Sequence, residues 1–548
     1  MTPDDLRSAA ERWLADDPDE TSRAELRALL DGLPGSAAEL ADRFAGPLTF
    51  GTAGLRGTLR AGPNGMNLAV VTRAAAGLVA WLAEQGADGP LVIGYDARYG
   101  SRAFAERTAE VATGAGRPAL LLPRPLPTPV LAAAVRTLDA VAGVMVTASH
   151  NPPQDNGYKV YLGAALGGAR GAGAQIVPPA DRGIEAAIQA VPAVADVPLG
   201  APGTVLDEAI VAGYVTAAAA VVDPAGPRNL TVAYTPLHGV GGPVLVDAFT
   251  AAGFAAPATV AEQFAADPDF PTVAFPNPEE PGAMDLLLAL AERTGADVAI
   301  ANDPDADRCA VAVPAAGGWR ALRGDELGAL LADHLMRRGA TGTYATTIVS
   351  SSLLLAMAAA RGVPYGETLT GFKWIVRAAD DLAFGYEEAL GYCVAPGHVR
   401  DKDGITAALV VAELAAGLKA AGRTLTDRLD ELAAAYGVHA TDQLSVRVAQ
   451  LDEIGTMMAA LRARPPGELL GVELTEFADL APNADVVILR TAGARVVVRP
   501  SGTEPKLKAY LEVVEEAADG DVPAARARAA AALTALRAET AAVLGVPA

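Results

Sequence analysis

VAGVMVTASHNPP, residues 141–153, joins an apolar run of strand length to a short polar loop. The run 141–146 predicts a buried strand, because it is apolar throughout and turn residues follow it. Pro152 and Pro153 fix their own φ angles and disfavour helix in the residue before them. The loop is therefore stiff, and we expect it to hold the Ser149 hydroxyl at a strand end. An isolated Ser-His pair would indicate only a turn, and no Gly-x-Ser-x-Gly elbow of an α/β-hydrolase occurs.

Apolar runs of strand length alternate with alanine-rich stretches of helical length, which predicts an α/β fold. At 548 residues the chain is too long for one core, so several domains are expected. The predicted strands are 91–95, 119–122, 141–146, 230–234, 298–301, 344–349 and 496–498. The predicted helices are 68–84, 103–113, 284–293, 326–337 and 524–544. Segments rich in proline and glycine predict linkers at 163–179, 191–203, 224–227 and 462–467.

The charge balance, an uncharged run and the N-terminus argue against several classes of protein. A net charge of -22, from 43 basic and 65 acidic residues, disfavours a nucleic-acid partner. The uncharged run 339–360 is broken by glycine, serine and threonine, so we predict a buried strand and helix there and no membrane span. The acidic N-terminus lacks the features of a signal peptide, which predicts a cytoplasmic protein. Two cysteines are too few for a disulfide framework.

DPDADR, residues 303–308, places three aspartates at alternating positions directly after the predicted strand 298–301. In an extended chain such carboxylates point to one side and would repel one another unless a cation lay among them. Oxygen ligands suit Mg²⁺, so the segment predicts a magnesium site. A solvated acidic turn is the alternative. An EF-hand is excluded, because Arg308 and Pro314 stand where that loop needs glycine and glutamate.

RPSGTEP, residues 499–505, combines a guanidinium, two hydroxyls and a glycine whose backbone can approach a ligand closely. These are the parts of a phosphate-binding loop, with Arg499, Ser501, Gly502 and Thr503 as its candidate residues. The alternative is a simple turn between two strands.

Four further charged residues lie in glycine-flanked segments: Arg56 in FGTAGLRG, Lys373 in GFKW, and Glu387 and Glu388 in GYEEALGY. Paired carboxylates can accept hydrogen bonds from two sugar hydroxyls. Taken alone, each of these residues would be a solvated surface group. His238 has two interpretations, a residue that lines the site and a cap of the following helix. The chain contains no Walker A or Gly-x-Gly-x-x-Gly sequence, so nucleotide binding has no support.

Together, and in this order, the three loops resemble those of the α-D-phosphohexomutase superfamily, the phosphoglucomutase and phosphomannomutase enzymes. The resemblance extends over almost the whole chain, from Phe50 to Tyr510. It implies an α/β fold with a four-domain phosphohexomutase architecture around a central cleft. The expected domains are a phosphoserine domain at 1–205, a metal-binding domain at 206–320, a sugar-binding domain at 321–435 and a phosphate-binding domain at 436–548.

The resemblance also implies a role for each candidate residue. The phosphorylated serine maps onto Ser149, and the metal ligands map onto Ser149 through its phosphate, Asp303, Asp305 and Asp307. Catalytic residues that handle protons or stabilise charge map onto Arg56, His150, Lys159, Arg308 and Lys373. Glu387 and Glu388 would bind the sugar, and the loop 499–505 would bind its phosphate.

The implied reaction is an intramolecular phosphoryl transfer between hexose 1-phosphate and hexose 6-phosphate through phosphoserine and a bisphosphate. Mg²⁺ is the implied cofactor and glucose 1,6-bisphosphate the implied activator. The expected partner is a small phosphorylated sugar, and the expected assembly is a monomer or a dimer. Glucose is favoured, but Ala389 stands where many glucose- and mannose-acting members have serine, so phosphomannomutase, phosphopentomutase and sugar-bisphosphate synthase activities remain alternatives. Outside the family, a sugar-phosphate phosphatase and a non-catalytic sensor are the alternatives.

Overall fold

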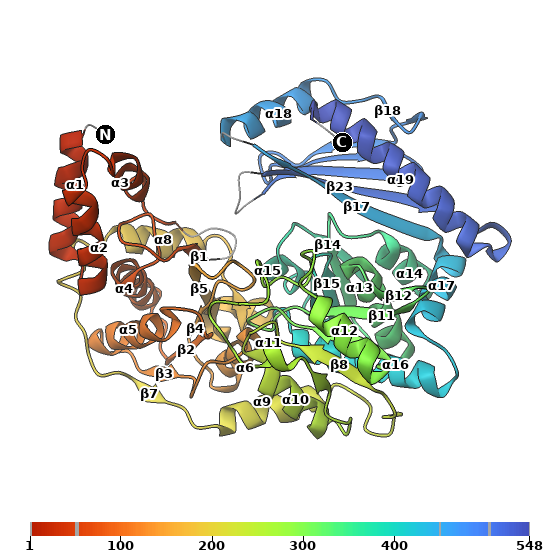
Figure 1. Cartoon of the computed structure of the whole chain (residues 1–548), viewed down its shortest axis with the longest axis horizontal. Coiled ribbons are helices and arrows are strands. Elements are labelled where there is room, and N and C mark those ends of the chain that lie inside the picture. The colour runs from red at the N-terminus through yellow and green to blue at the C-terminus, as the bar shows by residue number, and fades with distance from the viewer. Residues whose placement is uncertain (1–2, 50–53, 449–450, 502–505, 547–548) are drawn as a thin grey trace. The chain divides into compact units, whose positions relative to one another are not determined.

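The computed structural model describes residues 3–49, 54–448, 451–501 and 506–546 (Figure 1). The chain divides into two compact units. Unit 1 comprises Met1–Leu322 and Gly391–Gly417, and unit 2 comprises Arg323–Leu390 and Leu418–Ala548.

Unit 1 begins with a bundle of three helices, α1 (Pro3–Asp16), α2 (Glu20–Asp31) and α3 (Ala37–Arg43). Leucine and alanine side chains fill the bundle, among them Leu6, Leu26 and Leu40. Glu25 of α2 pairs with the Arg43 guanidinium at 2.6 Å and also accepts the N–H of Ala61 at 3.0 Å. This carboxylate therefore ties the bundle to the start of the first sheet.

The first sheet has seven strands, in the order β1-β5-β4-β2-β3-β7 with β6 beside β5. Its strands are β1 (Leu55–Thr58), β2 (Leu91–Tyr95), β3 (Ala119–Leu121), β4 (Ala142–Val146), β5 (Asp155–Leu162), β6 (Ala174–Gln175) and β7 (Thr204–Val205). The strands β4, β2, β3 and β7 run parallel, whereas β5 is antiparallel to both β4 and β1. Its helices are α4 (Leu68–Glu84), α5 (Ser101–Gly114), α6 (Thr128–Thr137), α7 (Ala164–Gly171) and α8 (Ala180–Gln189).

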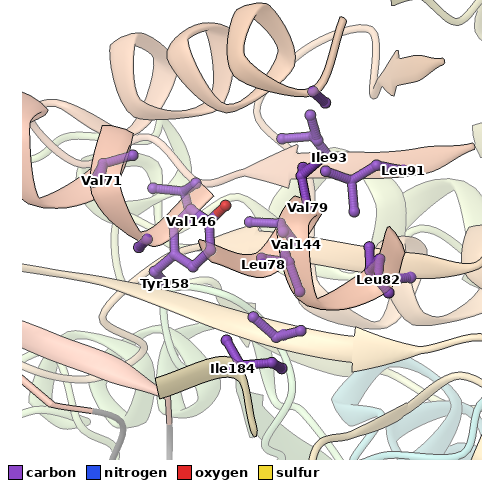
Figure 2. Packing of buried hydrophobic residues seen from close by; sticks show 14 of the residues in the cluster. Val71, Leu78, Val79, Leu82, Leu91, Ile93, Val144, Val146, Tyr158 and Ile184 are labelled. Carbon is purple, nitrogen blue, oxygen red and sulfur yellow. The ribbon is translucent and has the colours of Figure 1, made fainter. Parts of the chain in front are cut away.

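The core of this sheet lies against α4 (Figure 2). Leu78 and Leu82 of α4 pack with Ile93 of β2 and Val144 of β4, and all four side chains are fully buried. Burial of each such side chain contributes about 1.5–3 kcal/mol. The central strands are buried on both faces, and for this reason their sequences are continuous apolar runs.

The second sheet of unit 1 has the order β12-β11-β10-β8-β9. Its strands are β8 (Val232–Thr235), β9 (Ala258–Thr259), β10 (Val298–Ala301), β11 (Ala310–Ala315) and β12 (Gly318–Ala321). The strands β9, β8 and β10 are parallel, and β11 and β12 continue the sheet antiparallel. The helices of this part are α9 (Ala209–Ala219), α10 (Gly241–Ala251), α11 (Ala261–Phe264) and α12 (Asp285–Thr294). Unit 1 also includes β16 (Gly391–Cys393) and α16 (Gly404–Ala420) as far as Gly417.

Unit 2 combines a parallel and an antiparallel sheet. The strands β13 (Thr343–Thr347), β14 (Tyr365–Thr368) and β15 (Leu382–Glu387) are parallel, with helices α13 (Gly324–Arg337), α14 (Leu353–Arg361), α15 (Phe372–Ile375) and α17 (Leu425–Tyr436). The antiparallel sheet has the order β17-β23-β22-β21-β20. Its strands are β17 (Val438–Arg447), β20 (Glu476–Asp479), β21 (Val487–Arg490), β22 (Ala494–Pro500) and β23 (Lys506–Glu515).

The antiparallel sheet is covered on both faces. Helices α18 (Leu451–Ala463) and α19 (Val522–Leu544) lie along one face (Figure 1). The residues after β13, Ile348 and Val349, pack against Val497 and Tyr510 on the other face. A small hairpin, β18 (Glu468–Leu469) and β19 (Val472–Glu473), and a 3₁₀ turn, η1 (Ala518–Gly520), complete the unit.

The predicted alternation of strands and helices is confirmed, because every predicted strand and helix overlaps an observed one. The linker predicted at 163–179 is wrong, because that segment contains α7 and β6. Gly168 has a φ of 63° inside α7 and interrupts the helix. The glycine-rich sequence of α7 concealed this element.

The run 339–360 holds β13 and most of α14, as predicted. Among the described residues, no single helix is long and apolar enough to cross a membrane.

Two mid-helix glycines provide a matched test of the α4–α8 contact. A Cβ atom on Gly77 of α4 would lie 2.5 Å from the backbone nitrogen of Ile188 in α8. We expect Gly77→Ala to force these helices apart and to lower the free energy of unfolding by about 1–3 kcal/mol. Gly213 of α9 is exposed and has open space around it. We expect Gly213→Ala to stabilise unit 1 by about 0.5–1 kcal/mol, because alanine favours the helix.

Denaturant-induced unfolding of the two variants and the wild type measures both effects. The substitutions are chemically identical, so their opposite signs separate packing from helix propensity. A Gly77→Ala protein as stable as the wild type would contradict the close packing of α4 on α8.

Candidate active site

Ser149 lies in the loop between β4 and β5, with 3% of its surface exposed. Its φ of 52° is in the left-handed region, which costs a residue other than glycine about 1–2 kcal/mol. The backbone N–H of Ser149 donates a hydrogen bond to Oγ1 of Thr147 at 2.9 Å. A strained serine held beyond the end of a buried strand therefore presents its hydroxyl in one direction.

Two side chains contact this hydroxyl. Oγ of Ser149 donates to Oδ2 of Asp303 at 2.9 Å and lies 3.2 Å from Nδ1 of His150. Burial of the His150 ring, with the nearby guanidinium groups of Arg308 and Arg56, holds the pKa of His150 well below its ordinary value. The serine hydroxyl thus lies between a carboxyl group and a neutral imidazole.

The three aspartates of DPDADR converge after β10. One carboxylate oxygen from each of Asp303, Asp305 and Asp307 lies within 4.8 Å of the others, and all three side chains are buried. Ala306 turns the loop with a φ of 54°. Among the described residues, Oδ1 of Asp305 and Oδ1 of Asp307 are buried without a hydrogen-bond partner. Buried carboxylate oxygens of this kind suit a hard cation, so the donor set fits Mg²⁺.

The surroundings shift the pKa values of Asp303 and Asp305 in opposite directions. Burial and the negative charges of Asp305 and Asp307 raise the pKa of Asp303 well above its usual range. Burial also works against the charge of Asp305, but the Lys159 ammonium, with hydrogen bonds from Thr128 and Asp303, outweighs it, and the pKa of Asp305 is lowered. The loop therefore concentrates negative charge that a neighbouring cation must balance.

Side chains from several elements supply that positive charge. Nζ of Lys159, on β5, lies 2.7 Å from Oδ2 of Asp305 and 3.2 Å from Oδ2 of Asp307. Nζ of Lys402 also lies 3.2 Å from Oδ2 of Asp307. Burial opposes the charge on Lys159, but Asp305 and Asp307 outweigh it and raise the pKa of this lysine. Lys159 is therefore an ammonium group in this structure.

Two arginines lie next to these groups. The backbone N–H of Arg308 donates to Oδ1 of Asp303 at 3.0 Å, and Nε of Arg308 is 3.9 Å from both Asp303 and Asp307. Arg56 of β1 donates to Oδ1 of Asn151 at 3.0 Å, in the loop 147–154 that carries Ser149, the serine loop. The structure thus brings together all the predicted site residues of unit 1: Arg56, Ser149, His150, Lys159, Asp303, Asp305, Asp307 and Arg308.

In unit 2, the predicted sugar-binding residue Glu388 follows β15. Its Oε2 accepts hydrogen bonds from Oγ1 of Thr347 at 3.2 Å and from Oγ of Ser350 at 3.1 Å. Burial, followed by the charge of Glu387, raises the pKa of Glu388 to about 7. Lys373 of α15 is buried, with its ammonium 5.9 Å from the ring centre of Trp374.

The predicted phosphate-binding loop begins at the end of β22. Nη1 of Arg499 lies 3.4 Å from the hydroxyl of Tyr510 on β23, and the N–H of Ser501 donates to the carbonyl of Lys506 at 2.8 Å. Burial raises the pKa of Tyr510, and the charge of Glu388 raises it further. Tyr510 therefore contacts the arginine of this loop and is influenced by the charge of the carboxyl after β15. Gly502 and Thr503 lie outside the described residues.

Three residues around the serine and the aspartates were not predicted from the sequence. Thr128, the first residue of α6, donates to Asp305 at 2.6 Å, Lys402 pairs with Asp307, and Arg98 binds the serine loop. A signal existed for Lys402 and Arg98. RDKDG, residues 400–404, is a charged run before an apolar helix, and DAR, residues 96–98, directly follows a predicted strand.

The chain matches four families of domains in sequence. They are described as phosphoglucomutase/phosphomannomutase alpha/beta/alpha domain I at residues 47–193, domain II at 212–317 and domain III at 323–436, and the C-terminal domain at 444–529. The predicted four-domain α/β architecture is thereby confirmed, whereas the boundaries drawn from the sequence stay predictions.

Similar proteins are named as sugar-phosphate mutases. A probable phosphomannomutase of Haemophilus influenzae is 47% identical over 82% of this chain and 93% of its own length. The human phosphopentomutase is 33% identical over 93% of this chain and 92% of its own length. The crystal structure of a putative phosphomannomutase from Thermus thermophilus is 27% identical, covers 89% of this chain and 99% of its own, and has a TM-score of 0.69.

Relatives of this identity and coverage establish both the family and the type of enzyme, an isomerase that acts as a phosphosugar mutase. The chain belongs to the phosphoglucomutase/phosphomannomutase family of the α-D-phosphohexomutase superfamily.

Proposed function

We propose that this enzyme interconverts hexose 1-phosphate and hexose 6-phosphate, with glucose as the preferred sugar, through a phosphorylated Ser149. The observation that carries the proposal is the buried Ser149 hydroxyl, 2.9 Å from Asp303 at the edge of the three-aspartate cluster. Oγ of Ser149 can carry the phosphoryl group there, because cationic side chains lie around the cluster.

Asp303, Asp305 and Asp307, together with an oxygen of the phosphorylated serine, would hold Mg²⁺, which when bound supplies neutralisation of the phosphoryl charge. Arg308 and Lys402 add positive charge at the same carboxylates. Their fixed positions favour the transition state, because preorganised charges need no rearrangement during the reaction.

The substrate's own phosphate would bind to Arg499, Ser501, Gly502 and Thr503. Glu387 and Glu388 would accept hydrogen bonds from the ring hydroxyls, and Lys373 would add positive charge. The substrate's free hydroxyl attacks the phosphorus, so a new oxygen–phosphorus bond forms as the bond to Oγ of Ser149 breaks. The bisphosphate then turns end for end, and its other phosphoryl group returns to Ser149. Glucose 1,6-bisphosphate would act as activator, because it can restore a lost serine phosphate.

Lys159 and His150 are the two candidates for accepting the hydroxyl proton. His150 is neutral and its Nδ1 lies 3.2 Å from Oγ of Ser149, whereas Lys159 is held charged by two aspartates. Arg56 would stabilise charge, because arginine keeps its proton under almost all conditions.

The preference for glucose depends on the loop Glu387–Ala389, in which Ala389 replaces the serine of many glucose- and mannose-acting members. The relatives carry the names phosphomannomutase, phosphoribomutase, phosphopentomutase and phosphoglucomutase. Phosphomannomutase, phosphopentomutase and sugar-bisphosphate synthase activities are therefore the alternatives to the proposed substrate. A monomer or a dimer is the proposed assembly.

The serine mechanism predicts that Ser149→Ala lowers mutase turnover by at least on the order of 10³-fold, because no oxygen remains to carry the phosphoryl group. Intact-mass measurement should show one phosphoryl group on the wild type after incubation with glucose 1,6-bisphosphate and none on the variant. Ser8→Ala, at an exposed position of α1, is the control. Near-normal turnover by Ser149→Ala, or a phosphoryl group trapped on Asp303 as in a phosphatase, would refute the mechanism.

The aspartate cluster predicts that Mg²⁺ stabilises the unphosphorylated enzyme. Binding to the folded state alone should add about 2.7 kcal/mol when free Mg²⁺ is a hundredfold above Kd, and Tm should rise accordingly. Asp307→Asn should lose most of this rise, because one of the three converging carboxylates is removed. Asp31→Asn, at an exposed position of α2, should keep it. Calorimetric melting with and without Mg²⁺ measures the shift, and an equal rise in both variants would place the ion elsewhere.

The proposed sugar preference predicts a rank order of kcat/KM. Glucose 1-phosphate should exceed the 1-phosphates of mannose, glucosamine and ribose when each is assayed with catalytic glucose 1,6-bisphosphate. Ala389→Ser is the matched probe of the sugar loop and should change the ratio of glucose to ribose rather than the rate of serine phosphorylation. A higher kcat/KM for ribose 1-phosphate would assign the wild type to the phosphopentomutase alternative.

A further inference from the structure

Arg98 lies in the turn between β2 and α5, in contact with the serine loop, and only 1% of its side chain is exposed. Its Nη2 donates to the carbonyls of Ser149 at 2.6 Å and Asn151 at 2.5 Å. Its Nη1 donates to the carbonyls of Pro152 at 2.8 Å and Asp155 at 3.2 Å. The four carbonyls belong to the loop after β4 and to the first residue of β5. One guanidinium therefore forms hydrogen bonds along most of the serine loop.

The buried carboxyl group of Asp96 lies next to the guanidinium. Oδ2 of Asp96 lies 3.4 Å from Nε of Arg98, and Oδ1 of Asp96 accepts the N–H of Arg98 at 3.0 Å. The hydroxyl of Ser101, the first residue of α5, also donates to Asp96 at 2.6 Å. Asp96 is thus held by the start of the helix and in turn orients Arg98.

An aromatic ring packs against the guanidinium. The Cζ atom of Arg98 lies 4.9 Å from the ring centre of Phe270, a buried residue with a φ of 47°. Its segment is anchored by His238, whose carbonyl accepts the N–H of Asp267 at 3.0 Å and whose Nε2 lies 2.8 Å from Oγ1 of Thr272. His238, which the sequence left with two interpretations, therefore anchors the segment that carries Phe270.

We propose that Arg98 is a positioning residue for the reacting serine, and that Phe270, anchored through His238, holds the guanidinium in place. The inference deepens the proposed function and rests on it, because Ser149 must be the phosphorylated residue. The left-handed conformation of Ser149 needs support from its surroundings, and the four hydrogen bonds from Arg98 provide it. A lysine could not replace the guanidinium, because an ammonium is a point charge without the planar fork that reaches carbonyls on two sides.

The positioning role can be separated from general support of the fold by comparing phosphoryl transfer with substrate binding. Arg98→Lys keeps the charge opposite Asp96 and loses the fork. We expect the rate of Ser149 phosphorylation by glucose 1,6-bisphosphate, measured by quenched-flow and intact mass, to fall on the order of 100-fold, as for a displacement of about 1 Å. The Kd of glucose 1-phosphate, measured in the Ser149→Ala background, should stay within about twofold, because Arg98 contacts the serine loop and not the residues proposed to bind the sugar.

Arg102→Lys, at an exposed position of α5 paired with Glu106, is the control and should phosphorylate at the wild-type rate. A wild-type rate in folded Arg98→Lys, or an equal loss of transfer and of binding, would overturn the positioning role. Absence of phosphate on Ser149 in the wild type would instead overturn the proposed function itself, so the two failures are distinguishable.

Phe270→Leu provides a second test that changes neither Arg98 nor any of its hydrogen-bond partners. Loss of the ring lets the guanidinium move, and we expect phosphorylation of Ser149 to slow on the order of tenfold. This variant decides the question if Arg98→Lys does not fold. An unchanged rate in folded Phe270→Leu would overturn the part assigned to Phe270, and with an unfolded Arg98→Lys it would overturn the proposal.

Discussion

The mutual repulsion of Asp303, Asp305 and Asp307 is the constraint on which much of unit 1 depends. Three carboxylates buried close together are unfavourable unless positive charge surrounds them, and removing one partner of a buried ion pair costs about 3–5 kcal/mol. The compensating lysines come from places far apart in the chain, Lys159 on β5 and Lys402 before α16. The ion pair of Lys402 is one of several contacts, with those of Asp401 and Asp403, that join residues 391–417 to unit 1, although the chain on either side of them belongs to unit 2.

Local patterns predicted the elements and much of the candidate site. Ser149 and Asp303 were found because each follows a continuous apolar run, and those runs are β4 and β10. Arg98 and Lys402 were missed because their roles depend on contacts between distant segments. Arg98 binds Asp155, 57 residues away, and no periodicity in the sequence reports such a contact. The helix α7 was missed for a local reason, the left-handed Gly168 within it.

Unit 2 is joined internally by a buried ion pair. Arg495 of β22 lies 2.9 Å from Glu512 of β23 and also donates to the carbonyls of Ile348 and Ser350, which follow β13. Glu512 in turn accepts the hydroxyl of Ser351 at 2.8 Å. The loop after β13 is thereby fixed to the antiparallel sheet. The proposed sugar-binding carboxyl, which accepts a hydrogen bond from Ser350, and the proposed phosphate-binding arginine on β22 thus belong to the same compact unit.

Because of the half-buried carboxyl of Glu388, the affinity for a ligand that binds to this group should depend on pH. With a pKa of about 7, this group is divided between its acid and its anion at neutral pH. A hydroxyl that donates to the anion lowers that pKa, so binding expels a proton from the protein. By linkage, the same ligand binds more weakly as the solution becomes acidic. If Glu388 holds a sugar hydroxyl as proposed, a drop in pH would therefore loosen that hold.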